Sequence, residues 1–290
     1  MGRAGERMLR IGCVKYLNAR PLIRGWPGAV EFDHPSALCK RLANGELDVA
    51  LVSSFEFLRN PIYRIVDDVS ISSDGPVYSV VVAHRGDISE IKEIQLDPAS
   101  QTAVNLLRCL LKELGLNPRF IRAVLGSTGC QPVVSGNLPD TKAWLLIGDQ
   151  AIRFHEEHAS EFQFWDLGEQ WQKLVDLPFV YALWLIRPEV ADPKRIANRL
   201  RALRDENLAN LDHVIGEIVA GVGLSRRSSK AKADDPGQSN QLNHEFLGRY
   251  YREHLRFGFG EKERKGLQTF ANLCIKRGLL SKRDLLFDLV

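Results

Sequence analysis

Short runs of apolar residues predict a series of strands in the first two thirds of the chain. Several runs are continuous rather than alternating, as in strands that are buried on both faces of a sheet. Many of their residues are β-branched, which favours strand over helix. The predicted strands cover residues 9–14, 31–34, 47–54, 78–84, 143–148 and 179–186.

Apolar positions at helical spacing predict helices between these strands. The clearest pattern covers residues 100–115, where Ser100 can cap the N-terminus and Gly115 can end the helix. A second helix is expected at 35–45, with Ser36 as its cap. Alternating strands and helices predict an α/β fold with mostly parallel sheets.

The pattern changes after Pro193, where helical patterns follow one another without strands. Residues 194–221 predict one or two amphipathic helices, and residues 244–255 and 261–278 predict two more. Between them, residues 225–241 are rich in Ser, Lys and Asp and poor in apolar side chains. This composition predicts a mobile surface insert.

Length and composition narrow the class of protein. A chain of 290 residues favours two domains over one small core. With 44% hydrophobic and 26% charged residues, it has the composition of a soluble globular protein. A formal net charge of +3 is too small to indicate binding to nucleic acid or to a membrane surface.

Cysteine usage and the N-terminal segment predict a cytoplasmic protein. The five cysteines are scattered and form no CxxC pair, which argues for reduced thiols and against a disulfide framework or a zinc site. The first ten residues are charged and lack the apolar stretch of a signal peptide. The longest strongly apolar run, at 179–186, is too short to span a bilayer.

Motifs for cofactor or nucleophile chemistry are missing from the sequence. It contains no Walker loop, no Rossmann fingerprint and no GxSxG elbow. His155 and His158 have a spacing that a metal could use, but their charged neighbours favour a solvated helix end. We therefore expect neither a metal nor a cofactor.

Small polar residues recur where predicted strands end and predicted helices begin. Ligands of open α/β folds bind beyond the carboxyl ends of strands, and helix N-termini favour anions. For any single serine, a simple helix cap is the favoured interpretation, whereas the group together favours a site for a small carboxylate. The candidate residues are Asn18, Ser36, Ser53, Ser79, Ser100, Gln101 and Thr102.

The segment "VKYLNARPL" adds an arginine to this group. Its strand should deliver Asn18 to the cleft and stop at Pro21, which cannot continue a β-ladder. Arg20 would then be placed to attract an anionic ligand, although an ion pair with another part of the chain is an equally good interpretation.

Taken in order, seven segments resemble the chorismate dehydratase family of the futalosine route to menaquinone. The resemblance covers roughly residues 8–280, apart from 225–241. The segments are "YLNARPL", "PSALCKRLANGELDVALVSSFEFL", "SDGPVYSVVVAH", "LDPASQTAVNLLRCLL", "LLIGDQAI", "WDLGEQWQKLVDLPFVYALW" and "YYREHLRFGFGEKERKGLQTFANLC".

The resemblance implies a two-lobed fold of the type II periplasmic binding proteins, with a ligand cleft between the lobes. It implies a first lobe formed by 8–82 and 183–290 and a second lobe formed by 83–182. It also implies a cofactor-free lyase that dehydrates chorismate, a dicarboxylate, to 3-[(1-carboxyvinyl)oxy]benzoate in the first step of that route. By resemblance, Asn18 and Ser79 are the expected catalytic residues.

Two departures from the family bear on the substrate. The helix-start motif Ser-Arg-Thr-Ser is here Ser100, Gln101, Thr102 and Ala103, so an arginine and one hydroxyl are missing. A Thr-Gly pair is replaced by Val175 and Asp176. A non-catalytic binding protein for an aromatic or dicarboxylic metabolite, and the sister 1,4-dihydroxy-6-naphthoate synthase, stay open as alternatives. The chain could be a monomer or a homodimer.

Overall fold

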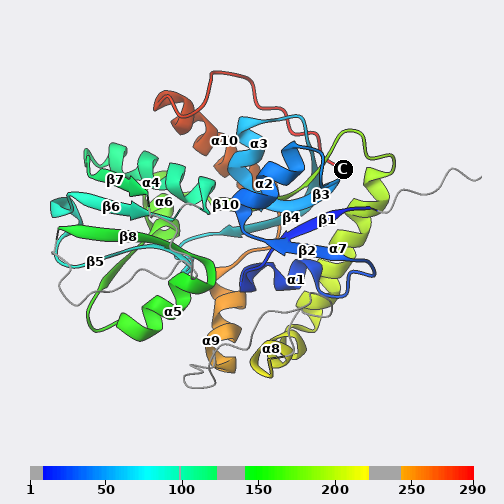
Figure 1. Cartoon of the computed structure of the whole chain (residues 1–290), viewed down its shortest axis with the longest axis horizontal. Helices are drawn as coiled ribbons and strands as arrows, with labels where there is room; N and C mark the ends of the chain where they lie inside the picture. The colour runs from blue at the N-terminus through cyan, green and yellow to red at the C-terminus, as the bar shows by residue number, and fades with distance from the viewer. Residues whose placement is uncertain (1–8, 98, 123–140, 222–242) are drawn as a thin grey trace, which may run out of the picture.

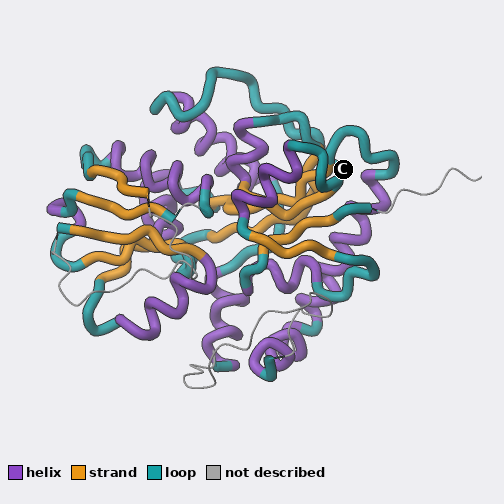
Figure 2. The backbone as a smooth tube through the Cα atoms, in the orientation of Figure 1, coloured by secondary structure: helices purple, strands orange, loops and turns teal. Residues whose placement is uncertain are grey.

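Two β-sheets form the framework of the protein. The computed structural model describes residues 9–97, 99–122, 141–221 and 243–290. The two sheets lie at opposite sides of the molecule in Figure 1, and helices flank both of them in Figure 2. The α/β prediction is confirmed. The insert predicted at 225–241 lies outside the described residues.

The first sheet has the strand order β2-β1-β3-β10-β4. Strand β1 is parallel to β2 and β3, whereas β10 is antiparallel to β3 and β4. The strands are β1 (Ile11–Val14), β2 (Val30–Asp33), β3 (Val49–Ser53), β4 (Arg64–Ser73) and β10 (Phe179–Ile186).

The second sheet has the order β7-β6-β8-β5-β9. Strand β6 is parallel to β7 and β8, and β5 is antiparallel to β8 and β9. The strands are β5 (Val80–His84), β6 (Glu93–Leu96), β7 (Arg119–Arg122), β8 (Lys142–Ile147) and β9 (Gln163–Asp166).

The chain crosses twice between the sheets. It leaves the first sheet after Ser73, enters the second at Val80, and returns between Asp166 and Phe179. The strands next to these crossings, β5 and β10, run against their neighbours. The other four strands of each sheet share one direction, so the prediction of mostly parallel sheets is confirmed, with one reversed strand in each sheet. The division into lobes at 8–82 with 183–290 and at 83–182 stays a prediction.

Strand β4 has no counterpart among the predicted strands because polar residues interrupt its apolar pattern. It carries two adjacent aspartates and several serines. The serine hydroxyls are satisfied by distant backbone: Ser70 Oγ donates to the carbonyl of Gly258, and Ser72 Oγ donates to that of Arg256 at 3.3 Å. Hydrogen bonds to the C-terminal segment thus allow this polar stretch to be buried as a strand.

The rest of the described chain forms α-helices, the 3-10 turns η1 and η2, a π-helix, η3, and connecting loops. The α-helices at 35–43, 101–113, 193–209, 211–219, 244–249 and 261–276 agree with the predicted patterns. The elements are η1 (Leu17–Ala19), α1 (Arg20–Ile23), α2 (Pro35–Ala43), α3 (Ser54–Arg59), η2 (Ile88–Glu90), α4 (Gln101–Glu113), α5 (Gly148–His158), α6 (Leu167–Val175), α7 (Pro193–Ala209), α8 (Leu211–Val219), α9 (His244–Arg249), η3 (Tyr250–His254) and α10 (Glu261–Lys276).

The predicted helix caps had different outcomes. Ser100 is the N-cap of α4, and its hydroxyl accepts a hydrogen bond from the Ala103 amide at 3.1 Å. Ser36 is not a cap, because the position belongs to His34 and Pro35 opens α2. A proline suits the first helical turn, where its missing N–H costs nothing, and this places the start one residue before Ser36.

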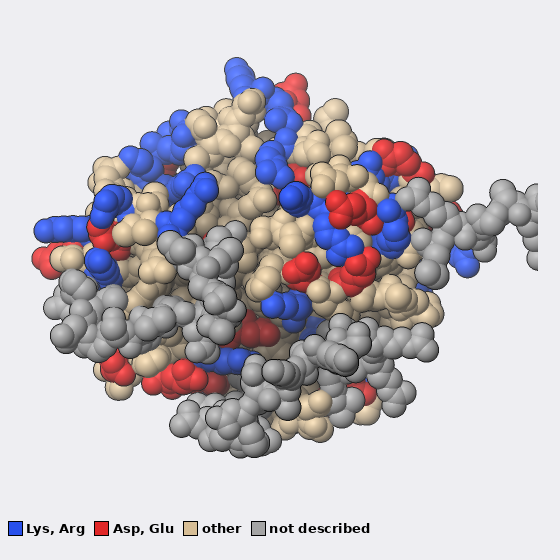
Figure 3. Space-filling view, viewed as in Figure 1, with Lys and Arg blue, Asp and Glu red and all other residues tan. Residues whose placement is uncertain are grey.

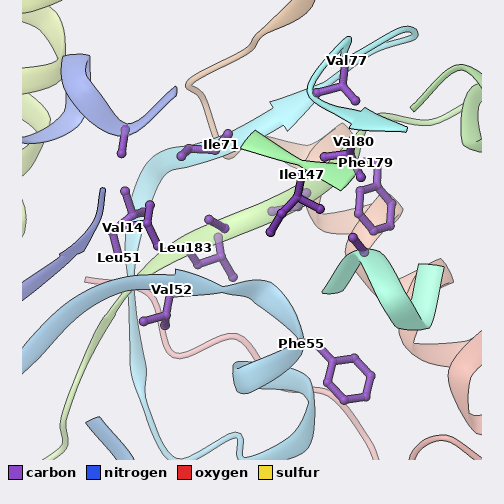
Figure 4. Packing of buried hydrophobic residues seen from close by; sticks show 14 of the residues in the cluster. Val14, Leu51, Val52, Phe55, Ile71, Val77, Val80, Ile147, Phe179 and Leu183 are labelled. Atoms are coloured by element: carbon purple, nitrogen blue, oxygen red, sulfur yellow. The ribbon is translucent and has the colours of Figure 1, made fainter. Parts of the chain in front are cut away.

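Both sheets contribute to one large hydrophobic core. Strand β5 shows how, since its alternate residues face opposite sides. Val80 and Val82 join the large core, whereas Val81 and Ala83 join a smaller cluster around Trp144. Figure 4 shows side chains of the first sheet and of the second packed within one apolar region.

The visible surface carries both signs of charge. Basic and acidic side chains are interspersed on the face in Figure 3, in keeping with the small net charge. Among the described helices, none combines the length and apolar character needed to cross a bilayer.

Candidate functional site

The end of β1 meets the start of α5 across the two sheets. The amide of Leu17 donates to Asp149 Oδ1 at 2.9 Å. Gly148 has a φ of +58°, and a Cβ there would lie 2.8 Å from the ring of Tyr16. Only a glycine accommodates both the backbone conformation and the close ring. These contacts hold the segment before Asn18 against the second sheet.

Asp149 does not cap its own helix. Helix α5 begins at Gly148 with Ile147 at its N-cap, and the Asp149 carboxylate accepts from the other sheet's segment instead. Burial raises the pKa of Asp149, while the Leu17 amide and the nearby cation Arg20 oppose that rise. This acidic group thus lies beside the predicted site.

Three polar side chains from distant parts of the chain converge next to this contact: Asn18, Ser79 and Tyr250, named here the Asn18 cluster. The Tyr250 hydroxyl donates to Ser79 Oγ at 2.8 Å, and both residues are fully buried. Burial raises the pKa of Tyr250, and hydrogen bonding by Ser79 and Asn18 partly opposes that rise. The structure therefore brings the two residues expected to be catalytic to one tyrosine.

One atom of the Asn18 cluster lacks a partner. Oδ1 of Asn18 is buried and makes no hydrogen bond within the described chain. A buried polar atom without a partner is uncommon in native proteins and marks a place for water or a ligand. Ser79, for its part, lies immediately before β5 and not within the strand, because its amide bonds to the Val77 carbonyl at 2.7 Å.

Arg20 is the first residue of α1 and lies close to the Asn18 cluster. Its guanidinium forms no ion pair with any described residue, and its Nε is buried without a hydrogen-bond partner. The alternative interpretation of Arg20, a structural ion pair, therefore has no support in the described chain. Neighbouring Arg24 differs, since it pairs with Glu217 at 2.6 Å.

A second group of buried side chains joins β3, α3 and α4: Ser53, Ser54 and Thr102, named here the hydroxyl cluster. Ser53 Oγ contacts Thr102 Oγ1, which also accepts from the Phe55 amide at 3.1 Å. Ser54 Oγ donates to the carbonyl of Val180 at 2.7 Å. Every hydroxyl in this cluster has a protein partner.

The remaining predicted residues lie at helix starts. Ser36 is in the first turn of α2, while Ser100 and Gln101 open α4. All three are partly exposed, unlike Thr102 in the next position of α4. The structure therefore splits the predicted set into an Asn18 cluster, a hydroxyl cluster and partly exposed helix starts.

Sequence reasoning missed a carboxylate that ties the two crossings together. Asp166 caps α6 and accepts hydrogen bonds from four backbone amides, those of Val77, Tyr78, Gly168 and Glu169, at 2.6–3.1 Å. Burial raises its pKa and these amides lower it. Its signal was an aspartate directly before a helical pattern, which is typical of an N-cap.

The two tyrosines of η3 were also missed as site residues. Tyr250 reaches Ser79, and Tyr251 donates to the carbonyl of Leu17 at 2.7 Å. The pair "YY" lies in a helical pattern where aromatic residues usually pack in the core. Because both partners lie more than 170 positions away, local sequence carried no signal for these hydrogen bonds.

The described residues contain no group of three His, Cys, Asp or Glu side chains that could hold a metal ion. The two histidines weighed as metal ligands have other contacts. His155 Nδ1 lies 2.8 Å from the Tyr78 hydroxyl, and His158 Nδ1 lies 3.2 Å from Glu161. Each imidazole ring thus has a hydrogen-bonding partner, a tyrosine hydroxyl for His155 and a carboxylate for His158.

Solved structures with this architecture include binding proteins. A crystal structure of a protein from Archaeoglobus fulgidus matches with a TM-score of 0.68 and 17% identity, covering 94% of this chain and 98% of that one. The alkanesulfonate-binding protein of Xanthomonas axonopodis pv. citri, bound to MOPS, matches with a TM-score of 0.58 and 17% identity, covering 96% and 95%. The two-lobed periplasmic-binding-protein fold is thereby confirmed.

Sequence comparison extends over nearly the whole chain. The chorismate dehydratase of Thermus thermophilus is 30% identical in an alignment of 282 residues that covers 90% of this chain and 93% of that protein. The model of a family described as menaquinone biosynthesis matches residues 9–276. This chain therefore belongs to the menaquinone biosynthesis family.

Proposed function

We propose that this protein is a chorismate dehydratase, which removes water from chorismate to give 3-[(1-carboxyvinyl)oxy]benzoate for menaquinone synthesis. The observation that carries the proposal is the similarity to the Thermus thermophilus enzyme over 90% of the chain. The reaction takes a proton and the hydroxyl group from the ring, and the ring becomes aromatic. Because aromatisation drives the step, the protein has mainly to position and polarise its substrate.

Asn18 is the residue we assign to the ring hydroxyl. Its buried Oδ1 has no partner among the residues that the structure describes and can only accept a hydrogen bond. A carboxylate cannot supply that hydrogen, whereas a substrate hydroxyl can. This favours the hydroxyl over a carboxylate as the group that faces Oδ1.

Ser79 supplies the complementary donor. Its oxygen accepts from Tyr250, so its own hydrogen is available to another oxygen. Negative charge develops on the ring hydroxyl oxygen as the carbon–oxygen bond breaks, and a hydrogen bond there stabilises the transition state. The ring proton goes to a base, for which we propose the substrate's own enolpyruvyl carboxylate. That proton and the hydroxyl leave together as water.

Arg20 and the start of α4 are proposed to hold the two carboxylates. The guanidinium of Arg20 has a fork of donors that matches a carboxylate and forms no ion pair among the described residues. Ser100, Gln101 and the first amides of α4 offer a second anion site, since a helix N-terminus carries partial positive charge. Ser36 at the start of α2 would border the cleft.

The proposed setting is a cytoplasmic one. Cys13, Cys39, Cys109 and Cys274 are all buried free thiols, which fits a reducing compartment. Chorismate is the proposed small-molecule partner.

The direct test is to incubate the purified protein with chorismate and follow the benzoate product by chromatography. We expect conversion without any added cofactor. Saturable binding of chorismate without product would instead identify a binding protein. Turnover of the cyclic futalosine-derived compound, with none of chorismate, would identify naphthoate synthase chemistry.

A further inference from the structure

The π-helix η3 contacts both elements that carry the proposed catalytic residues. Tyr250 donates to Ser79, which precedes β5 of the second sheet. Tyr251 donates to the carbonyl of Leu17, which precedes Asn18 and follows β1 of the first sheet. Both tyrosines are at most 2% exposed. A π-helical turn is rare and frequently lies at a functional site.

Hydrogen positions in the Asn18 cluster follow from its donors and acceptors. A tyrosine hydroxyl has a single hydrogen, and that of Tyr250 points at Ser79 Oγ. A serine hydroxyl also has a single hydrogen, so Ser79 does not donate to Tyr250 in this arrangement. Its hydrogen is free to point elsewhere, and Asn18 Oδ1 has no donor among the described residues. The cluster around Tyr250 therefore contains one unused donor and one unused acceptor.

We infer that Tyr250 is a positioning residue, which donates to Ser79 and so keeps the Ser79 hydrogen directed at the hydroxyl oxygen of the bound substrate. The inference rests on the proposed function. Without the tyrosine hydroxyl, the Ser79 hydroxyl could rotate and donate its hydrogen bond to a protein or water oxygen instead of to the substrate. The donor that stabilises the departing oxygen would then be present in only part of the molecules.

A role for Tyr250 as a base is disfavoured by its surroundings. Burial raises its pKa, and the hydrogen bonds with Ser79 and Asn18 only partly oppose this. The hydroxyl therefore stays protonated at neutral pH and keeps its hydrogen for Ser79. We therefore assign Tyr250 a role through its hydrogen bond to Ser79 and not as the group that takes the proton.

The test is a double-mutant cycle of Tyr250→Phe and Ser79→Ala, measured as kcat and KM for chorismate. Tyr250→Phe removes one oxygen and leaves the ring in place. We expect it to lower kcat roughly tenfold, about the effect of one well-placed hydrogen bond, with little change in KM. In the Ser79→Ala background, we expect the same substitution to cause no further loss of kcat.

Tyr63→Phe is the matched control, because Tyr63 is a buried tyrosine whose hydroxyl accepts from Asn60 at 3.3 Å, away from the Asn18 cluster. It should leave kcat unchanged. Independent losses from Tyr250→Phe and Ser79→Ala that multiply in the double variant would overturn the inference. Unchanged kcat in Tyr250→Phe would do the same. Both outcomes leave wild-type turnover intact, whereas a wild-type protein that makes no product overturns the proposed function itself and this inference with it.

Discussion

The Asn18 cluster and the hydroxyl cluster look alike in composition and differ in how their hydrogen bonds are used. Both gather small polar side chains where segments of the two sheets meet. In the hydroxyl cluster, Ser53, Ser54 and Thr102 all bond to protein partners. In the Asn18 cluster, a buried oxygen has no partner within the described chain, and Arg20 nearby forms no ion pair there.

This difference is what we expect between a purely structural contact and the proposed ligand site. Satisfied buried polar groups stabilise one arrangement of the backbone and specify a unique core. Unsatisfied ones cost free energy unless something fills them, so they persist where a ligand supplies the partner. We therefore expect substitutions in the Asn18 cluster to change turnover and those in the hydroxyl cluster to change stability.

The largest effect is expected for Asn18→Ala. The substitution removes the acceptor for the ring hydroxyl, and kcat for chorismate should fall about 100-fold, as for the loss of one polar group that aligns a transition state. The melting temperature should fall only modestly, since the substitution removes one hydrogen bond, the one with Tyr250, while Oδ1 makes none in the described chain. Steady-state kinetics with the exposed control Asn44→Ala would test this, and near-normal turnover would remove Asn18 from the site.

A large effect on binding is expected for Ser100→Asp. Aspartate should still cap α4, so the free energy of unfolding should be retained. Its fixed charge would occupy the place of a substrate carboxylate, whose interaction with a helix N-terminus contributes up to ~2 kcal/mol. Calorimetric titration with the benzoate product should show roughly 30-fold weaker binding. Unchanged affinity would mean that α4 does not face the ligand.

Arg20→Gln should raise KM for chorismate about tenfold with a smaller change in kcat, because a charge-assisted hydrogen bond to a carboxylate is lost. Arg24→Gln is the matched control on the same segment. Arg24 already pairs with Glu217, so its loss should affect stability by ~1 kcal/mol or less and leave KM unchanged. Equal KM values for the two variants would contradict the role of Arg20.

The smallest effect on turnover is expected for Thr102→Val, which keeps the shape of the side chain. The Phe55 amide and the Ser53 hydroxyl would lose their partner, at a cost of about 2 kcal/mol in the free energy of unfolding. Turnover should stay within about twofold at a temperature where the variant is folded. Thermal unfolding and kinetics on the same sample would measure both, and a selective loss of kcat would place Thr102 in the ligand site.

Local pattern predicted much of the fold but not the reversed strand in each sheet. The apolar runs at 9–14, 47–54 and 179–186 contain strands as predicted, and Ser100 caps its helix. The first of these strands ends at Val14, whereas it was expected to stop at Pro21, because η1 and α1 follow it directly. Strand β4 escaped prediction because its polar residues are satisfied only by the distant C-terminal segment. The direction of β10 depends on where the chain crosses between sheets, which no local pattern records.

The candidate site divides in the same way. The sequence by itself determined that small polar residues lie after strands and at the starts of helices. Its family resemblance identified Asn18 and Ser79 as the expected catalytic residues. Only the tertiary structure decided that these two meet at Tyr250, 171 positions from Ser79, while Ser53 and Thr102 bond to each other. The reason is physical. The residue type determines which hydrogen bonds a side chain can make, but whether a partner lies within about 3 Å depends on how distant segments of the chain pack together.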